Sequence, residues 1–332
     1  MNIVIATDAW PPQISGVVTT LKRTIDELGK LGHDVLTIHP GRFAVTFPCP
    51  TYPQIRLALT GRDGFDRQLN GFVPDAIHIV TEGPVGLACR HFCRRKKLNF
   101  TTSFTTRFDE YVELRFRVPS RYIFRMMRWF HSAAAKVMIS SKPLQNELID
   151  KGFSNTVLWP RGVDTDLFRI RDKSFISDAR PIFLYVGRVA VEKNIQSFLS
   201  LDLPGTKYVV GDGPSLAKLK IDFPDVRFVG AKHGEELARY YGASDVFVFP
   251  SLTDTFGIVM LEAMASGLPV AGYPVRGPID IVTEGVTGFL DHDLRTAALK
   301  ALKIDPQACR QFVRQYTWQK SARHFVENLV NV

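Results

Sequence analysis

Two carboxylic acids, Asp254 and Glu262, stand in an otherwise apolar stretch, "FPSLTDTFGIVMLEAMASGLPV" (249–270). On a helix, residues eight apart lie about 80° from each other around the axis and about 12 Å apart along it. That separation is too long for two carboxylates that share a proton, and it suits contacts with two ends of one extended ligand. The simplest alternative is that Asp254 caps the helix and Glu262 is a solvated or paired helix residue.

Two cations lie in a loop that follows another apolar run. Arg188 and Lys193 belong to "YVGRVAVEKN" (185–194). Fixed cations at the end of a strand can hold a diphosphate and stabilise the negative charge that develops when a sugar–diphosphate bond breaks. The alternative is local ion pairing, for instance with Glu192, and the segment alone does not decide between the two.

Two glycines also follow predicted strands. Gly16 ends the loop "TDAWPPQIS" and begins a helical pattern, so a phosphate could approach the free N–H groups at the helix start. Gly211 belongs to "VVGDGP" (209–214), which permits a tight turn beside a ligand. An ordinary turn is the alternative for both glycines. The second segment lacks GxGxxG spacing, and the chain contains no GxxxxGK[ST] sequence, so neither a dinucleotide site nor a P-loop is indicated.

Metal ligands are weakly represented. The chain has two Asp-x-Asp triplets, Asp164–Asp166 and Asp291–Asp293, but the first lies in a predicted hinge and the second in a late polar loop. Cys89 and Cys93 have helical spacing, but the sequence offers no nearby second pair to complete a site. We therefore expect neither a metal nor a bound cofactor.

The apolar runs predict the elements that position these residues. Expected strands are residues 2–7, 34–40, 76–80, 99–104 and 136–141 in the first half, and 181–187, 207–211, 226–230, 246–250 and 268–273 in the second. Helical patterns separate several of them, which indicates an α/β protein with doubly wound parallel sheets. We predict two Rossmann-like domains, residues 1–165 and 166–332, with a hinge at 160–181 and a ligand cleft between them.

Charge is unevenly divided between the two halves. Residues 1–165 carry 22 Lys and Arg against 14 Asp and Glu, whereas residues 166–332 carry 20 against 19. Most of the excess lies in residues 90–128. A basic first half suggests an anionic partner, such as a membrane surface, a nucleic acid or a phosphorylated substrate. No apolar run is long enough to span a membrane.

The motifs together are more specific than any one alone. The chain resembles family 4 of the retaining glycosyltransferases, which have the two-domain GT-B architecture. The resemblance covers essentially the whole length and rests on "PPQISGVVTTL", "RGVDTDLF", "VGRVAVEKN", "VVGDGP", "ASDVFVFPSLTDTFGIVMLEAMASGLPVA", "EGVTGFL" and "YTWQKSARHF". It implies an N-terminal domain that binds the acceptor and a C-terminal domain that binds a nucleotide sugar, with the final helix possible as a packing partner of the N-terminal domain.

The resemblance also implies roles for single residues. Arg188 and Lys193 would hold the donor diphosphate near Gly16, and Glu262 would bind the nucleotide ribose. Asp254 would bind hydroxyls of the donor sugar. The nucleotide-sugar site would further include Gly211, Phe256 and Gly257, and Arg188, Lys193 and Asp254 would form its catalytic part. Such enzymes retain anomeric configuration without a protein nucleophile, because the leaving phosphate can take the acceptor's proton.

Three positions depart from the family pattern. Asp254 replaces the first glutamate of the E-x7-E motif and is one methylene shorter. In "SFTTRFDEYV" (103–112), Thr105 replaces a histidine that lies beside the donor sugar in relatives, and Asp109 replaces a proline. Because a threonine hydroxyl does not titrate near neutral pH, Thr105 cannot supply an acid–base group.

The basic first half suggests which acceptor is used. In "SRYIFRMMRWFHSAA" (120–134), Arg121, Arg125 and Arg128 recur at helical spacing among bulky apolar residues, which suits an anionic lipid surface. The resemblance adds Trp10, Arg107 and Tyr111 to the acceptor or membrane side and is strongest to enzymes that glycosylate diacylglycerol or similar lipids. A core helix with a solvated arginine edge is the alternative.

The leading hypothesis is a cytoplasmic enzyme, peripheral to the inner face of the membrane, that moves a hexose or hexuronic acid from a UDP-sugar to a lipid hydroxyl. A second hypothesis keeps the chemistry but uses a donor such as GDP-mannose and a soluble or polyprenyl-linked glycan acceptor. A nucleotide-sugar epimerase on the same fold is a third. A nucleic-acid-binding protein is not favoured, because the cations of residues 90–97 follow no recognised binding pattern.

Overall fold

A computed structural model describes residues 1–13, 15–49, 52–61, 63–254 and 256–332. Within these ranges the side chains of residues 52–54, 111 and 114–116 are not described. The chain forms two compact units: Met1–Arg161 together with Trp318–Val332, and Gly162–Thr317. The structural division therefore follows Arg161, whereas the sequence suggested a division after residue 165.

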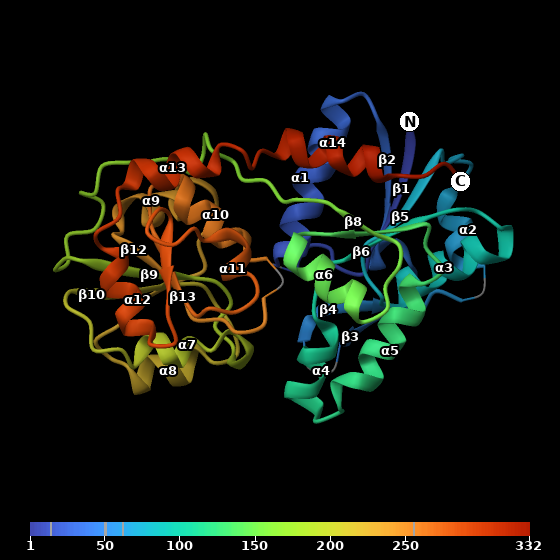
Figure 1. Cartoon of the computed structure of the whole chain (residues 1–332). Helices are drawn as coiled ribbons and strands as arrows, with labels where there is room; N and C mark the ends of the chain where they lie inside the picture. Colours follow the sequence, from blue (N-terminus) through green and yellow to red (C-terminus); the bar gives the residue numbers. More distant parts are fainter. Residues whose placement is uncertain (14, 50–51, 62, 255) are drawn as a thin grey trace. The chain divides into compact units, whose positions relative to one another are not determined.

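The first unit is built on a six-stranded parallel sheet (Figure 1). Its strands are β1 (Asn2–Ala6), β2 (Asp34–Ile38), β5 (Ala76–Ile79), β6 (Thr101–Phe104), β7 (Lys136–Ile139) and β8 (Thr156–Leu158), in the order β2-β1-β5-β6-β7-β8. A separate antiparallel hairpin, β3 (Thr46–Cys49) and β4 (Tyr52–Ala58), was not predicted from the sequence.

Helices cover both faces of this sheet. They are α1 (Gly16–Lys30), η1 (Pro40–Arg42), α2 (Gly64–Leu69), α3 (Pro84–Lys96), α4 (Phe108–Phe116), α5 (Ser120–His131), α6 (Lys142–Asp150) and α14 (Trp318–Asn328). Helices α1 and α14 share one apolar core, in which Leu21 and Leu28 lie with Phe325. Helices α2, α3 and α5 share another core. The last helix of the chain thus completes the first unit.

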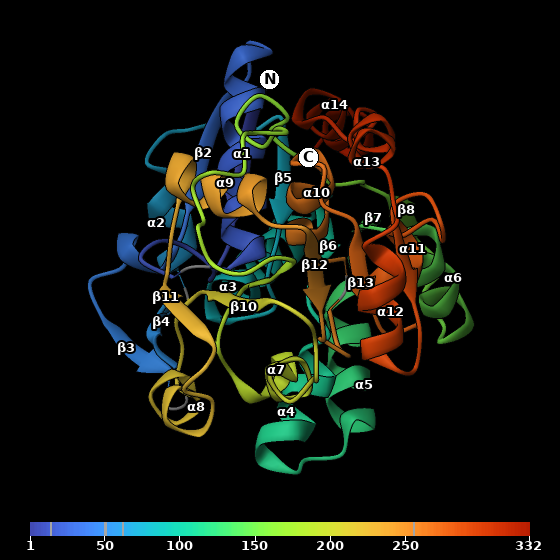
Figure 2. The same ribbon diagram turned by 90° about the vertical axis from the view of Figure 1, so that its left-hand side faces the viewer.

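The second unit repeats the plan (Figure 2). Its strands are β9 (Ile182–Val186), β10 (Thr206–Val210), β11 (Arg227–Gly230), β12 (Val246–Phe249), β13 (Val270–Gly272) and β14 (Gly288–Leu290), in the order β11-β10-β9-β12-β13-β14. Its helices are η2 (Val191–Lys193), α7 (Ile195–Leu199), α8 (Leu216–Asp222), α9 (Gly234–Ala243), α10 (Ile258–Ala265), α11 (Pro278–Ile281), α12 (Leu294–Ala301) and α13 (Pro306–Val313). One face packs on α9, α10 and α13, and the other on α7, α8 and α12.

The burial pattern explains why these segments pair in parallel. All five residues of β9 are buried, as expected for a strand that is covered on both faces. Each sheet has one point where the strand order reverses, between β1 and β5 in the first unit and between β9 and β12 in the second. Ligands of doubly wound proteins bind at such switch points, outside the carboxyl ends of the strands. The predicted fold class is confirmed.

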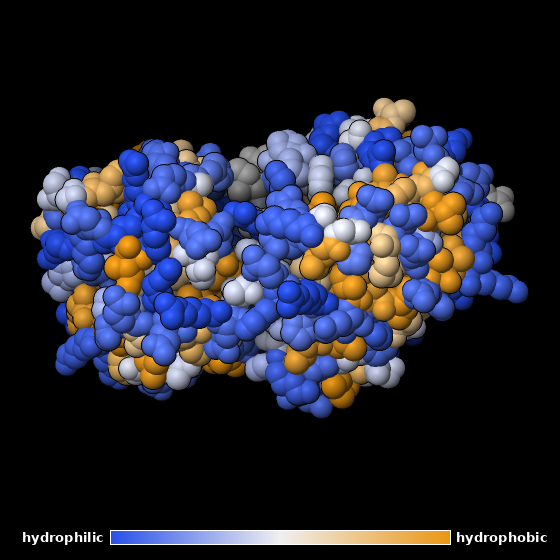
Figure 3. All heavy atoms as spheres, turned by 90° about the horizontal axis from the view of Figure 1, so that it is seen from above, coloured by the Kyte–Doolittle hydropathy of each residue, from blue (hydrophilic) through white to orange (hydrophobic). Residues whose placement is uncertain are grey.

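Neither helix nor strand occurs in residues 160–181, the predicted hinge. Arg310 secures part of this segment, because its guanidinium donates to the carbonyls of Phe168 at 3.0 Å and Thr165 at 3.1 Å. Among the described residues, no helix combines the length and the hydropathy that a membrane span requires. Polar residues cover most of the face seen in Figure 3, and hydrophobic ones show between them.

Candidate functional site

The second unit brings two predicted loops together at its switch point. One loop follows β9 and the other follows β12, and these strands are hydrogen-bonded neighbours. The Asn194 side chain donates to the carbonyl of Pro250 at 3.1 Å, and the Thr253 hydroxyl donates to the carbonyl of Glu192 at 3.4 Å. The loops therefore hold each other in place at the edge of the sheet where a ligand is expected.

Lys193 and Asp254 form the closest charged contact of this site. The Lys193 Nζ lies 2.6 Å from Asp254 Oδ1, and the two side chains are 20% and 18% exposed. The other carboxylate oxygen, Asp254 Oδ2, is buried and has no hydrogen-bond partner among the described residues. Because an unsatisfied buried acceptor is unfavourable, this oxygen is placed to accept a hydrogen bond from a bound hydroxyl.

Helix α10 begins beside this carboxylate, and no side chain of the described residues caps it. Its N-cap is Gly257, in the left-handed region at φ 85°, where a Cβ would lie 2.6 Å from Met260 Cε. Asp254 is therefore not the N-cap that the sequence allowed, and the helix starts at Ile258. The Phe256 ring packs in the core, and contact of its main chain with a ligand stays a prediction. An uncapped helix start favours an anion.

Glu262 lies farther along α10 and is held by a residue that the sequence did not single out. The buried Tyr241 hydroxyl of α9 donates to Glu262 Oε2 at 3.0 Å. Burial and the nearby carboxylate raise the pKa of Tyr241, so its hydroxyl keeps its proton. Glu262 itself is only half-buried. Tyr241 thus fixes one carboxylate oxygen of Glu262.

Arg188 and Gly211, which were also predicted to belong to the nucleotide-sugar site, lie in the adjoining turns. Arg188 is half-buried, and its carbonyl accepts the Tyr185 hydroxyl at 2.8 Å, which anchors the turn after β9. A Cβ at Gly211 would lie 1.8 Å from the carbonyl oxygen of Gly187. Close backbone packing alone therefore requires glycine at position 211, and a ligand contact there remains a prediction.

The switch point of the first unit is closed by its own side chains. Asp8 follows β1, and its carboxylate accepts the amides of Val85 and Gly86 at the start of α3, at 2.8 and 3.3 Å. The Thr81 hydroxyl donates to the same carboxylate at 2.9 Å. Burial raises the pKa of Asp8 although these bonds favour its charged form. Asp8 occupies the helix start that an anionic ligand would need.

Gly16 lies nearby in the chain, at the first position of α1. Ser15 is the N-cap, and its hydroxyl accepts the Val18 amide at 3.3 Å. A Cβ at Gly16 would meet no described atom within 4 Å, and its φ is not in the left-handed region. Packing within the described residues therefore gives no reason for glycine here, which is consistent with close approach of a ligand.

The residues predicted to bind the acceptor or the membrane differ in how exposed they are. Arg107 is 4% exposed, and its guanidinium pairs with Asp109 at 2.9 Å, Glu110 at 2.8 Å and Glu147 at 2.7 Å. Three carboxylates neutralise this cation, so the structure does not present it to an acceptor. The substitution of aspartate for proline at position 109 supplies one of these carboxylates. The side chain of Tyr111 lies outside the described residues.

The remaining acceptor candidates are more accessible. Trp10 is half-buried and stacks on the His39 ring at 4.8 Å. Arg121, Arg125 and Arg128 are all exposed on α5. That helix buries Met127, Phe130 and His131 against the unit and also packs against α4.

Sequence reasoning missed a contact in the first unit between the half-buried Glu82 and the buried His131. Glu82 follows β5, and its Oε1 lies 3.0 Å from His131 Nε2, while the other ring nitrogen of His131 bonds the Thr102 hydroxyl at 2.8 Å. The three residues come from separate segments, so no spacing in the sequence predicts their contact.

The aspartate triplets have local roles. Asp164 accepts the amides of Asp166 and Leu167, and Asp293 caps α12 by accepting the Arg295 amide. In the described part of the chain, no cluster of three or more His, Cys, Asp or Glu could hold a metal ion.

Comparisons with known proteins identify the family. A family model described as Glycosyltransferase Family 4 matches residues 14–167, and one described as Glycosyl transferases group 1 matches residues 180–303. The chain is 31% identical over 317 residues to a GDP-mannose-dependent alpha-mannosyltransferase of Mycolicibacterium smegmatis, with 87% of this chain and 84% of that protein covered. It is 27% identical to an alpha-monoglucosyldiacylglycerol synthase of Streptococcus pneumoniae, with 98% and 83% covered.

Solved structures give the same fold. HepE from Anabaena, determined in complex with UDP-glucose, has a TM-score of 0.72 at 15% identity and covers 98% of both chains. The chain is therefore a glycosyltransferase of family 4 with the GT-B fold.

Proposed function

We propose that the chain is a retaining glycosyltransferase that moves a hexose or hexuronic acid from a UDP-sugar to a hydroxyl of a membrane lipid such as diacylglycerol. The observation that carries the proposal is the Lys193–Asp254 pair at the switch point. Among the described residues, one buried oxygen of Asp254 has no hydrogen-bond partner, and the adjacent helix start has no side-chain cap. A nucleotide sugar matches this arrangement, because it joins a diphosphate anion to a sugar rich in hydroxyls.

Each residue then has a defined task. Arg188, Lys193 and the first amides of α10 hold the diphosphate and stabilise the charge that grows on it. An ammonium has three N–H donors, so Lys193 can bridge Asp254 and a phosphate. Asp254 Oδ2 accepts a sugar hydroxyl, and Glu262, oriented by Tyr241, accepts the ribose hydroxyls.

The reaction needs no further group from the chain. The bond between the sugar C1 and the phosphate oxygen breaks while the acceptor oxygen bonds C1 on the same face. The acceptor proton passes to the departing phosphate, so configuration is retained and Thr105 need not replace the lost histidine. Cationic side chains do the electrostatic work, and we propose that no metal is required.

The lipid acceptor is supported by the first unit and by a relative. The exposed arginines of α5 belong to the more basic half of the chain, and one relative is named as a diacylglycerol glycolipid synthase. We propose that the chain works at the cytoplasmic face of a membrane as a peripheral protein.

A second candidate keeps the reaction but changes both substrates. A relative with somewhat higher identity is named as GDP-mannose-dependent, which favours GDP-mannose as the donor of this candidate. The acceptor of this candidate would be a soluble or polyprenyl-linked glycan. The two candidates differ in the base, the sugar and the acceptor, so one assay can separate them.

That assay is a panel of radiolabelled UDP- and GDP-sugars, each offered with total membrane lipid, with a glycan acceptor or with none. We expect transfer from a UDP-sugar into the lipid fraction, an α-linkage by NMR, and full activity in EDTA. Transfer only from GDP-mannose to glycan would contradict the leading proposal. Sugar conversion without acceptor would indicate an epimerase.

A further inference from the structure

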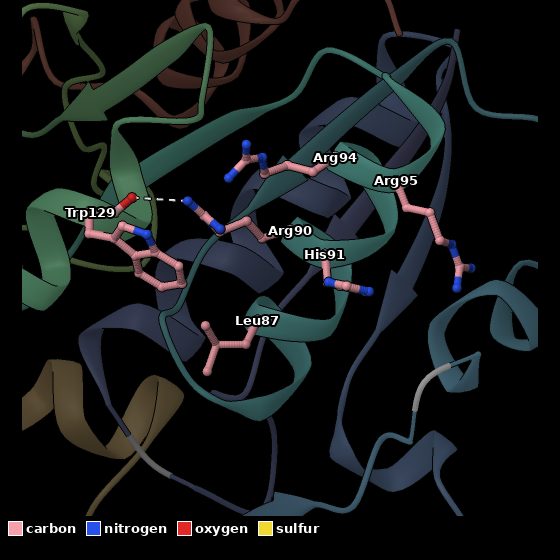
Figure 4. A pocket seen from close by; sticks show the side chains of 6 residues that line it. All are labelled: Leu87, Arg90, His91, Arg94, Arg95 and Trp129. Atoms are coloured by element: carbon pink, nitrogen blue, oxygen red, sulfur yellow. Dashed lines mark hydrogen bonds between the residues drawn. The ribbon is translucent and has the colours of Figure 1, made fainter.

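The first unit carries a cationic cavity between α3 and α5 that the transfer reaction does not use. The cavity has a volume of about 570 Å³ and is lined by Leu87, Arg90, His91, Arg94, Arg95 and Trp129. Trp129 comes from α5 and the other five residues from α3 (Figure 4). No carboxylate is among the lining residues. The lining therefore suits an anion.

Arg90 is fixed as one wall of this cavity. It is only 5% exposed, and its guanidinium lies 3.9 Å from the centre of the Trp129 ring. Its Nε donates to the carbonyl of Phe130 at 3.0 Å, and its Nη2 donates to that of Trp129 at 3.1 Å. These carbonyls end α5, so Arg90 also caps that helix. Among the described residues, no carboxylate pairs with this largely buried cation.

The neighbouring cations divide into two groups. Arg95 points away from Trp129 in Figure 4 and bonds Asp63 at 2.7 Å. Arg94 and His91 are exposed, and no ion pair joins either of them to an acidic residue in the described ranges. Among the described residues, Arg90 and Arg94 thus have no counter-ion, whereas Arg95 has one. Two uncompensated guanidinium groups at one cavity form the usual recognition pattern for phosphate.

The rim of the cavity indicates where the phosphate comes from. Leu87 is 42% exposed and Trp129 52% exposed. On α5, Tyr122, Met126 and Trp129 follow each other at i, i+4 and i+7 and are all exposed, and an arginine directly precedes each of the three. A dissolved phosphate would not need this apolar stripe. Aromatic residues and arginines side by side are typical of helices that lie at a membrane–water interface.

We propose that this cavity binds the headgroup phosphate of an anionic phospholipid, with Arg90 and Arg94 as phosphate ligands and Trp129 in the interface. The inference rests on the lipid part of the proposed function and not on the identity of the donor. It replaces a diffuse attraction to the membrane by one discrete site.

The test compares two single-charge variants of the full chain on the same vesicles. Arg94→Gln removes a proposed ligand, and Lys96→Gln removes an exposed cation of α3 that does not line the cavity. Binding is measured by co-sedimentation with phosphatidylcholine vesicles that contain phosphatidic acid. General attraction predicts about a fivefold loss for each variant, from roughly 1 kcal/mol per cation. A lost charge-assisted hydrogen bond raises the expected loss for Arg94→Gln to about fiftyfold. Equal losses would overturn the proposal.

Trp129 provides an independent readout. The chain has four tryptophans, of which Trp159 and Trp318 are buried and Trp10 is half-buried against His39. Brominated phospholipid should quench the intrinsic fluorescence, and Trp129→Phe should abolish most of that quenching. Quenching that persists in Trp129→Phe would place the lipid elsewhere and contradict the proposal.

Two further arms separate the possible causes of failure. Inorganic phosphate at the concentration of accessible lipid phosphate should not displace the vesicles, and full displacement would make the cavity a site for dissolved anions instead. UDP and GDP binding are measured without vesicles for the same variants. Normal nucleotide binding together with equal vesicle losses would reject this inference while the donor site stands, and absent nucleotide binding would reject the donor site alone.

Discussion

The two units have the same sheet topology but differ at the switch point, in whether a carboxylate of the chain binds the adjacent helix N-terminus. In the first unit, Asp8 fills the start of α3 with the chain's own carboxylate. In the second, α10 follows the N-cap Gly257, and no described side chain caps it. Asp254, in the loop before α10, pairs with Lys193 from the loop after β9 and has one oxygen without a partner among the described residues. The N-terminus of α3 is satisfied by a carboxylate of the chain, so its role is structural. Within the described ranges, the N-terminus of α10 has no such carboxylate and can bind an anionic ligand. The comparison supports the proposal that the donor binds to the second unit.

The largest effect is expected from Lys193→Gln. If Lys193 stabilises the departing diphosphate, kcat/KM should fall about 100- to 1,000-fold, as for other groups that stabilise developing charge. Lys218→Gln, which removes an exposed lysine of α8, is the control. Steady-state assays with the donor found in the panel measure both. Equal activity of the two variants would exclude Lys193 from the site.

The opposite behaviour is expected from Asp8→Ala in the first unit. Loss of the helix-start bonds should lower the free energy of unfolding by about 2 kcal/mol and leave nucleotide affinity unchanged. All four tryptophans, Trp10, Trp129, Trp159 and Trp318, belong to the first unit, so fluorescence-detected denaturation follows that unit. If Asp8→Ala left stability unchanged and abolished nucleotide binding, the structural role of Asp8 at the first switch point would be contradicted.

The strand ends explain why the sequence predicts part of this site. Apolar runs mark β9 and β12, and parallel strands present their carboxyl ends at one edge, so Lys193 and Asp254 could be expected together. The contact of Tyr241 with Glu262, and that of Glu82 with His131, join separate elements and follow no period. The suggestion that Asp254 caps α10 was wrong. The N-cap is Gly257, which has a positive φ and lies three residues after Asp254.

The sequence also predicted most strands of the fold but missed the short edge strands and the hairpin. Ten strands were expected, but β8 and β14 have three residues each and lie at sheet edges, so they leave little periodicity to detect. The β3–β4 hairpin contains Pro48 and Pro53, which argue against a strand in a sequence. Arg107 shows the same limit, because its partner Glu147 lies on another helix.

Acid should weaken the first unit through His78. This residue of β5 is fully buried, and burial lowers its pKa to about 3. The unfolded chain takes up a proton near pH 6.5 and the native state only near 3, so stability is lost as pH falls through that window. The expected slope is about 1.4 kcal/mol per pH unit.

The slope is read as a difference between the chain and His78→Gln, again by tryptophan fluorescence. The comparison is needed because Asp8, whose pKa is raised, acts in the opposite direction above its usual pKa. Parallel pH profiles for the two proteins would show that His78 does not set the acid sensitivity.

The smallest effect is expected from Tyr241→Phe in the second unit. Loss of one hydrogen bond to Glu262 should weaken nucleotide binding about fivefold, or roughly 1 kcal/mol. If Tyr241 acts only by orienting that carboxylate, the same change in a Glu262→Ala background should have no further effect. Titration calorimetry on the four proteins gives the coupling, and additive losses would mean that Tyr241 acts in another way.

The most direct test of the account is a division of labour between the two acids of α10 and its preceding loop. Calorimetry with free nucleotide and transfer assays are run on Glu262→Ala, Asp254→Ala and Glu284→Ala, the last removing an exposed acid of the same unit. The account predicts weaker nucleotide binding for Glu262→Ala alone, and for Asp254→Ala a lower turnover with nearly normal nucleotide affinity. Nucleotide affinity that is unchanged in Glu262→Ala would contradict it.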